Sequence, residues 1–124
     1  MKAMQLRALV RWLLVASLWV GCLSPTLPIP PPDSAVASVP DLNGEVTVSG
    51  GAGSAQSGAI ISVWNSNYVD PTSGTTGTGV DQPVATDGSW TAQIHGKSGD
   101  LLYIHQSYDG ETSPDLYVYV PSTP

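Results

Sequence analysis

The sequence predicts an all-β domain, an antiparallel β-sandwich of about seven strands that follows a signal peptide and a proline-rich linker. Three observations lead to this prediction. Apolar residues recur at every second position in several runs, whereas no apolar stripe with a 3.6-residue period persists for three turns. Turn-forming dipeptides separate these runs. The folding part is also rich in Gly, Ser, Thr and β-branched residues and contains no Phe, a composition that favours strands.

Five runs alternate clearly, and each places its apolar members on one face, as half-buried antiparallel strands require. The side chains expected in the core are Val46, Val48, Ile61, Val63, Trp90, Ala92, Ile94, Leu102, Ile104, Leu116, Val118 and Val120. Weaker strands near residues 80–85 bring the total to about seven, which suggests two sheets packed face to face. The Gly-, Ser- and Thr-rich stretch 65–83 is expected to be a flexible loop, with a short edge strand as the alternative.

Four dipeptides mark the turns between the runs: Gly50-Gly51, Asp87-Gly88, Gly99-Asp100 and Asp109-Gly110. Asp87-Gly88 is the strongest of them, since it stands directly between two short β-prone segments. It predicts a two-residue hairpin loop, which needs positive φ at both central positions.

The N-terminus has the three parts of an export signal. Lys2, Arg7 and Arg11 provide positive charge, residues 12–20 form a short apolar core, and Gly21 supplies a small residue before Cys22. A membrane-spanning helix needs roughly 20 apolar residues, so this core is too short to span. Cys22 is the only cysteine of the chain and has no partner for a disulfide after export.

A small residue followed by Cys at the end of a signal sequence resembles the lipid-attachment site of bacterial lipoproteins, with cleavage after Gly21 and lipidation of Cys22. Trp19 stands where that family usually has leucine. The resemblance implies three acyl chains on Cys22, and therefore a stable membrane anchor in the bacterial cell envelope. Since neither Leu23 nor Ser24 is aspartate, the outer membrane is favoured where the host has one. The alternatives are an uncleaved helix over residues 8–23 and an ordinary signal cut that leaves a free thiol.

The predicted organisation is a signal peptide over 1–21, the lipidated cysteine and linker over 22–40, the sandwich over 41–121 and a short tail over 122–124. Six prolines make the linker extended and semi-rigid. The whole chain has a formal charge of −6, and after removal of the signal Lys97 alone faces ten Asp and Glu, which leaves −9. Such a surface repels phosphate backbones, so no nucleic-acid partner is expected.

The order of the motifs resembles a bacterial immunoglobulin-like module. The resemblance covers nearly all of residues 41–121, and its motifs are Gly44-Glu45-Val46-Thr47-Val48, Gly58-Ala59-Ile60-Ile61-Ser62-Val63-Trp64, Asp87-Gly88-Ser89-Trp90, Gly99-Asp100-Leu101-Leu102 and Asp109-Gly110-Glu111. It implies an immunoglobulin-like sandwich. The carboxypeptidase-regulatory, transthyretin-like sandwich is the second resemblance, although its usual Pro-Gly-x-Tyr run is replaced here by Gly99-Asp100-Leu101.

No enzyme activity and no cofactor other than the covalent lipid are expected. Gly51-Ala52-Gly53 lacks the third glycine of a dinucleotide loop, and nothing in the sequence brings a Ser and an Asp to either histidine, His95 or His105. No metal site is expected either. The alternative is a calcium ion bound by Asp87, Asp100 and Asp109, if the sandwich gathers their turns.

Aromatic residues give the sharpest functional hypothesis. If Leu102 and Ile104 face the core, parity places four amphipathic side chains on one exposed face: Tyr103, His105, Tyr117 and Tyr119. Such a face suits sugar rings or a protein surface; the alternative is cross-strand pairing with no ligand. The sequence therefore predicts a non-catalytic structural or protein-interaction module held at the envelope membrane by its lipid. A carbohydrate- or ligand-binding accessory domain is the alternative, and the partner is another envelope protein or a glycan.

Overall fold

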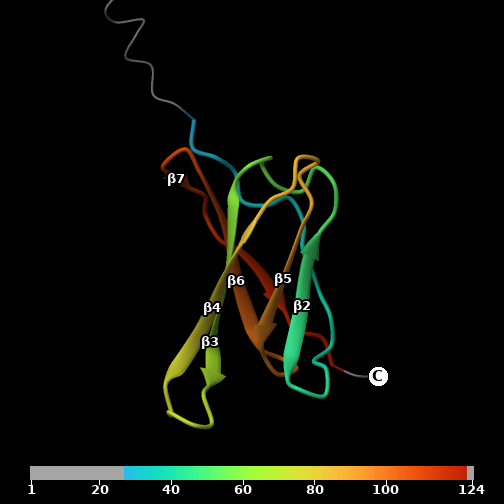
Figure 1. Ribbon diagram of the computed structural model, residues 1–124, viewed down its shortest axis with the longest axis vertical. Coiled ribbons are helices and arrows are strands. Elements are labelled where there is room, and N and C mark those ends of the chain that lie inside the picture. Colours follow the sequence, from blue (N-terminus) through green and yellow to red (C-terminus); the bar gives the residue numbers. More distant parts are fainter. Residues whose placement is uncertain (1–26, 123–124) are drawn as a thin grey trace, which may run out of the picture.

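A computed structural model describes residues 27–122, and these residues form an all-β sandwich of two antiparallel sheets. The three-stranded sheet A has the order β1-β2-β5, formed by β1 (Val36–Ala37), β2 (Glu45–Gly50) and β5 (Trp90–His95). Sheet B has the order β4-β3-β6-β7, and β8 also pairs with β6; its strands are β3 (Ile60–Val69), β4 (Thr76–Pro83), β6 (Leu101–Tyr108), β7 (Glu111–Thr112) and β8 (Leu116–Tyr119). The two sheets lie face to face (Figure 1). The predicted fold class is confirmed.

The core lies between the sheets, where the alternating pattern placed it. Val46 and Val48 of β2, Ile61 and Val63 of β3, and Leu102 and Ile104 of β6 are all almost fully buried. Trp90, Ala92 and Ile94 of β5 are buried opposite them, and Val120 closes the core beyond β8. The strands β2, β3, β5 and β6 therefore each bury one face of their period-two pattern, as a sandwich requires. Leu116 and Val118 of β8, which were also expected in the core, are only partly buried.

The stretch 65–83 differs from the expected flexible loop. β3 continues to Val69, and the chain returns as the edge strand β4, so that only residues 70–75 form the connecting turn. The pairing of Asn65 with Thr78 and of Val69 with Thr76 leaves a bulge between them. The alternative that was considered, a strand in this stretch, is correct, and the strand has eight residues.

The two-residue hairpin turn lies at Asp109-Gly110 instead of Asp87-Gly88. Asp109 and Gly110 have φ of 51° and 79°, and their neighbours Tyr108 and Glu111 pair directly. At Asp87-Gly88 only the glycine has positive φ. That turn connects β4 of sheet B with β5 of sheet A. The prediction of a two-residue hairpin there was wrong, because the chain changes sheets at this point.

The second half of the predicted linker belongs to the sandwich. β1 pairs with β2, Asp33 N–H donates to the carbonyl of Ser54 (2.7 Å), and Pro32 is fully buried. The folded part thus begins near Pro30, earlier than the predicted start at residue 41. No helix that is long and apolar enough to cross a membrane occurs in residues 27–122; Gly21, Cys22 and the predicted signal lie outside the described residues.

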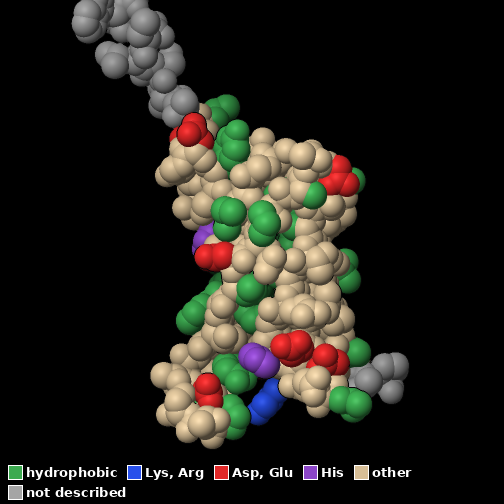
Figure 2. All heavy atoms as spheres, in the orientation of Figure 1, with side chains coloured by type: hydrophobic (Ala, Val, Ile, Leu, Met, Phe, Trp, Pro, Cys, Tyr) green, Lys and Arg blue, Asp and Glu red, His purple; other side chains and the backbone are tan. Residues whose placement is uncertain are grey.

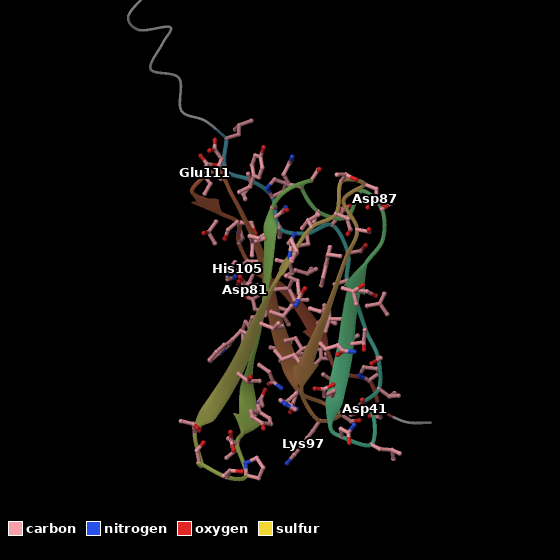
Figure 3. All side chains as sticks on the ribbon, viewed as in Figure 1. Asp41, Asp81, Asp87, Lys97, His105 and Glu111 are labelled. Atoms are coloured by element: carbon pink, nitrogen blue, oxygen red, sulfur yellow. The ribbon has the colours of Figure 1, made fainter. Side chains whose placement is uncertain are left out.

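The sandwich has two distinct ends. The N-terminal segment reaches it beside β7, at the end that also carries Asp87 and Glu111; we call this the tether end (Figures 1 and 3). Asp41 and Lys97 lie at the opposite end, which we call the far end (Figure 3). Acidic side chains lie at both ends (Figure 2), and Lys97 is the only Lys or Arg among residues 27–122.

Candidate functional site: the outer face of sheet B

Three aromatic side chains form a row across the outer face of sheet B. Trp64 of β3 is the direct partner of Tyr103 on β6, and Tyr103 is the direct partner of Tyr117 on β8. The Tyr103 and Tyr117 rings meet edge to face, with centroids 5.3 Å apart and planes inclined by 78°. Tyr119 lies in the next row, opposite Leu101. The two strands that carry the tyrosines are therefore neighbours, and Tyr103 and Tyr117 form one cross-strand ring pair.

This face is open to solvent. Tyr117 is 58% exposed, Tyr119 69% and Trp64 47%, while Tyr103 and His105 are half-buried. The stretch 65–83 does not cover the tyrosines, because it forms a hairpin that extends the sheet sideways through β4. Open aromatic rings on a rigid sheet offer flat apolar area with polar hydroxyl tips.

A polar row runs beside the aromatic row. Ser62 of β3 is the direct partner of Asp81 on β4 and of His105 on β6, and its hydroxyl donates to Oδ1 of Asp81 over 2.7 Å. On the far side of His105, Nδ1 lies 3.2 Å from Oδ1 of Asp115, so the imidazole N–H donates to that carboxylate. His105 and Asp81 lie close together in Figure 3. Sequence reasoning missed this row, because nothing in the sequence itself places Ser62, Asp81 and Asp115 beside His105.

The hydrogen bonds of the polar row differ from those of a Ser-His-Asp site. The Ser62 hydroxyl donates its hydrogen bond to Asp81, so the hydroxyl hydrogen points away from the imidazole of His105. A Ser-His-Asp site needs that proton on the histidine and free N–H groups that stabilise an oxyanion. Ser62 and His105 instead lie in the middle of paired strands, where main-chain groups are used by the ladder.

A shallow hollow of about 330 Å³ joins the two rows, lined by Trp64, Ser66, Tyr103, His105 and Asp115. Its lining combines the aromatic rings of Trp64 and Tyr103 with the carboxylate of Asp115. The structure thus brings together the predicted residues Tyr103 and His105, and adds Trp64 and Asp115, which the parity argument did not single out.

Trp64 lies flat against β4 because two glycines stand beneath it. A Cβ at Gly79 would lie 2.7 Å from Cε3 of the indole, and a Cβ at Gly77 would also meet the ring. Both glycines lie in the strand that was expected to be a loop. The alternation Thr76-Gly77-Thr78-Gly79 was the available signal, since glycine inside a strand often marks a close approach by another group.

The three aspartates considered for calcium are not brought together. Asp109 follows the last residue of β6 and Asp100 precedes the first, so that they lie at opposite ends of one strand. Asp100 Oδ2 accepts hydrogen bonds from Asn65 Nδ2 (3.0 Å) and Lys97 N–H (2.9 Å). The hydroxyl and then the N–H of Ser89 donate to Asp87 and lower the pKa of its carboxyl. Within residues 27–122, no three His, Cys, Asp or Glu side chains converge on a metal position.

A second aromatic cluster lies at the far end. The rings of Tyr68 and His95 stack with centroids 5.2 Å apart and planes inclined by 17°. Nearby, the main-chain N–H groups of Thr72 and Ser73 lower the pKa of Asp70 by donating to its carboxylate. Sequence reasoning left Tyr68 unassigned, because it belongs to the stretch that was read as a loop.

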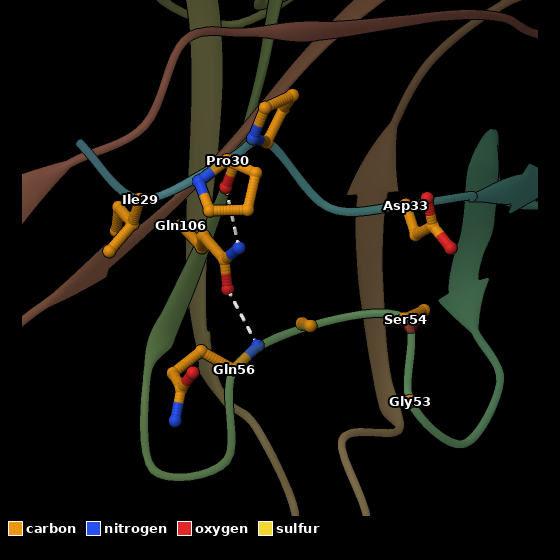
Figure 4. A pocket seen from close by; sticks show the side chains of 9 residues that line it. Ile29, Pro30, Asp33, Gly53, Ser54, Gln56 and Gln106 are labelled. Atoms are coloured by element: carbon orange, nitrogen blue, oxygen red, sulfur yellow. Dashed lines mark hydrogen bonds between the residues drawn. The ribbon is translucent and has the colours of Figure 1, made fainter. Parts of the chain in front are cut away.

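At the tether end, the buried side chain of Gln106 holds the N-terminal segment. Its Nε2 donates to the carbonyl of Pro30 over 2.7 Å, and its Oε1 accepts from the N–H of Gln56 over 2.8 Å (Figure 4). One amide thus joins the N-terminal segment and the loop after β2 to the core strand β6.

In three separate comparisons the chain matched no protein-family model, no curated protein and no solved structure.

Proposed function

We propose that this chain is a lipoprotein of the bacterial cell envelope that displays a non-catalytic interaction module. The observation that carries the proposal is the position of Cys22, the single cysteine, directly after a short apolar run and Gly21. Two or more acyl chains anchor a protein durably, and the acidic mature chain offers no basic patch that would do so instead. The outer membrane is the proposed location in a host with two membranes.

The docking of Pro30 by Gln106 supports a short tether. Residues 23–29 would span about 22 Å at ~3.1 Å per residue, much less than the 18 residues 23–40 would. A sandwich attached in this way would stand close to the membrane with its tether end inward. Its far end and the outer face of sheet B would remain free for a partner.

The strand pairings support an immunoglobulin-like identity for the module. In such sandwiches the first, second and fifth strands share one sheet, and the third, sixth and seventh share the other. β1-β2-β5 and β3-β6-β8 reproduce these two groups, if β7 is treated as an extension of the turn before β8. β4 joins β3 rather than sheet A, which is a variation on the ABED arrangement.

Intact-mass analysis and membrane fractionation of the wild type and of Cys22→Ser test the anchor. The wild type should carry the mass of the acyl chains and sediment with membranes, whereas Cys22→Ser should lose both properties. Ser24→Ala is the matched control, since it changes a neighbouring small residue and leaves the cysteine. An unmodified wild-type mass would overturn the proposal.

Glycan binding is the second candidate, and the openness of Tyr117 and Tyr119 favours it. Exposed rings can stack on sugar faces while their hydroxyl groups hydrogen-bond. Replacing Tyr103, Tyr117 and Tyr119 by Ser should abolish retention on immobilised cell-wall glycan. Tyr108→Ser is the control, because Tyr108 is also exposed but lies at the tether end of β6. Equal retention of the triple variant and the wild type would eliminate this candidate.

A further inference from the structure

β4 is an edge strand of sheet B, hydrogen-bonded to a neighbouring strand on one side, and it lies close to β5 of sheet A. Its ladder with β3 is regular from Thr78, paired with Asn65, to Pro83, paired with Ile60, and within the described residues no strand pairs with its other side. An edge strand presents unpaired N–H and C=O groups that another strand can pair with. Proteins protect such edges with charged side chains, above all Lys, with Pro, with β-bulges or with short strands. β4 has no Lys, its only Pro is the last residue, and its bulge with β3 lies outside the regular part from Thr78 to Pro83.

The other edges are less suited to accept a strand. β1 has two residues, and β8 has four and is followed directly by Pro121. β5 is longer, with six residues, but its exposed side chains Thr91, Gln93 and His95 include no carboxylate.

The outer face beside β4 carries a defined set of side chains. Gly77, Gly79 and Asp81 alternate along the strand, so they share that face. The two glycines place no side chain on this face, so the half-exposed indole of Trp64 lies directly over their backbone. Asp81 is exposed and accepts a hydrogen bond from Ser62. No Lys or Arg of residues 27–122 forms an ion pair with it.

The negative charge of the mature chain and of Asp81 favours a basic partner at this edge. A second copy of the mature chain would bring the same charge of −9, and the two copies would repel each other. A basic segment is complementary, because Lys or Arg can pair with Asp81 and lie against the indole face of Trp64. We infer that the β4 edge binds an extended, Lys- or Arg-bearing segment of a partner protein by strand addition.

The register defines what such a segment presents. Main-chain hydrogen bonds to β4 supply affinity, and alternate side chains supply specificity. The residue opposite Asp81 is basic, and the residue two positions away lies opposite Gly79, next to the ring of Trp64. The inference rests on the proposed interaction role of the module and specifies the chemical class of its partner.

Three synthetic ten-residue peptides test this inference with the full-length protein in detergent micelles. The first alternates Val with Lys, the second alternates Val with Glu, and the third repeats the Lys peptide with N-methyl groups at alternate positions. N-methylation removes main-chain donors and keeps the charge, so it separates strand addition from simple attraction between charges. Amide NMR shifts and hydrogen exchange of the protein report where each peptide binds.

The Lys peptide should shift the amides of residues 78–82 and slow their exchange, while N-methylation should weaken binding about tenfold or more. Asp81→Lys should weaken binding of the Lys peptide about three- to tenfold. Asp109→Asn is the control for lost negative charge, since Asn tolerates the left-handed φ of that turn; it should bind as the wild type does.

Equal binding of the Glu peptide or of the N-methylated peptide would overturn the inference, as would shifts centred on Tyr117 and Tyr119 or dimerisation of the protein through β4 without peptide. These measurements do not depend on lipidation. If the peptides do not bind as expected but the wild type is lipidated and membrane-bound, only the inference about β4 fails. If the Lys peptide binds at β4 but the wild type carries no lipid, only the proposed anchor fails.

Discussion

The indole of Trp64 lies across Gly79, its cross-strand partner on β4, so closely that a Cβ at this position would approach ring atom Cε3 to 2.7 Å. Real side chains essentially never come so close. The absence of a side chain on β4 therefore determines the orientation of the largest aromatic residue on the outer face of sheet B. As a result, the indole of Trp64 lies flat against the edge strand β4.

Gly79→Ala should displace this indole. The φ of Gly79 lies outside the left-handed region, so alanine suits the backbone and would by itself stabilise the strand by roughly 0.5–1 kcal/mol. We expect the steric conflict to reverse that sign and lower the free energy of unfolding by about 1 kcal/mol. Urea denaturation, together with the emission wavelength of Trp64, measures both effects.

Two comparisons isolate the contact between Gly79 and Trp64. Gly51→Ala is the matched control, since a Cβ at Gly51 meets no heavy atom within 4 Å. In a Trp64→Ala background, Gly79→Ala should no longer destabilise the protein, which gives a double-mutant cycle. The same effect of Gly79→Ala in both backgrounds would show that the indole is not the cause.

Asn65 provides a buried polar link between the sheets, and Asn65→Asp should weaken it strongly. Its Nδ2 donates to the carbonyl of His95 (2.9 Å) and to Asp100 Oδ2 (3.0 Å), and the residue is fully buried. A carboxylate would lose both donor hydrogens and face a second carboxylate. We expect a loss of about 2–4 kcal/mol in the free energy of unfolding at pH 7.

The pH dependence distinguishes this cause from poor packing. Burial and the neighbouring Asp100 raise the folded-state pKa of the introduced carboxyl, so its cost is largest above that pKa and shrinks as the pH falls through it. Urea denaturation at pH 7 and pH 5 measures the change. Asn43→Asp, at an exposed position, is the control. A variant that is equally destabilised at both pH values would contradict this account.

Gln106→Glu should release the N-terminal segment at the tether end. The carboxylate keeps an acceptor for the N–H of Gln56, but it cannot donate to the carbonyl of Pro30. We expect the amide of Asp33, which donates to Ser54, to exchange faster with solvent. Gln93→Glu on the exposed side of β5 is the control, and unchanged protection of Asp33 in Gln106→Glu would refute the role assigned to this side chain.

Alternation in the sequence identified most of the core, but it missed Ala37, Ala59 and Val84, and Leu116 and Val118 are only partly buried. Ile61, Val63, Leu102 and Ile104 lie where a period of two places them. The same period, continued along β3 and β6, points Asn65 and Gln106 inward as well, and both are buried. Sequence reasoning did not assign Asn65 and Gln106 to the core because their side chains are polar. A buried amide needs hydrogen-bond partners, and the sequence does not show which distant segments supply them.

The rest of the site depends on register, which the sequence does not define. The row of Asp81, Ser62, His105 and Asp115 exists only because three strands pair at one particular offset, and a shift of one residue would turn every side chain to the other face. β4 was read as a loop because Gly and Thr alternate in it without an apolar face. The turn at Asp87-Gly88 was misassigned because local propensity does not reveal that the chain passes from one sheet to the other.

Ser89 controls the acid response of the turn before β5. Its hydroxyl and its N–H both donate to Oδ1 of Asp87 and lower the pKa of that carboxyl below 3.8. A depressed folded-state pKa contributes stability that is complete above the unfolded-state pKa and is lost as the pH falls through the folded-state value. Ser89→Ala removes the stronger of the two donors, so the pKa of Asp87 should rise toward 3.8.

NMR titration of the Asp87 carboxyl carbon measures this shift directly. Asp70 serves as an internal control, since main-chain N–H groups of Thr72 and Ser73 lower its pKa independently of Ser89. Denaturation between about pH 5 and pH 2 should show a shallower loss of stability for Ser89→Ala than for the wild type, with Ser57→Ala as the control for removing an exposed hydroxyl. If the pKa of Asp87 were the same in Ser89→Ala and the wild type, the hydroxyl would not be its main determinant.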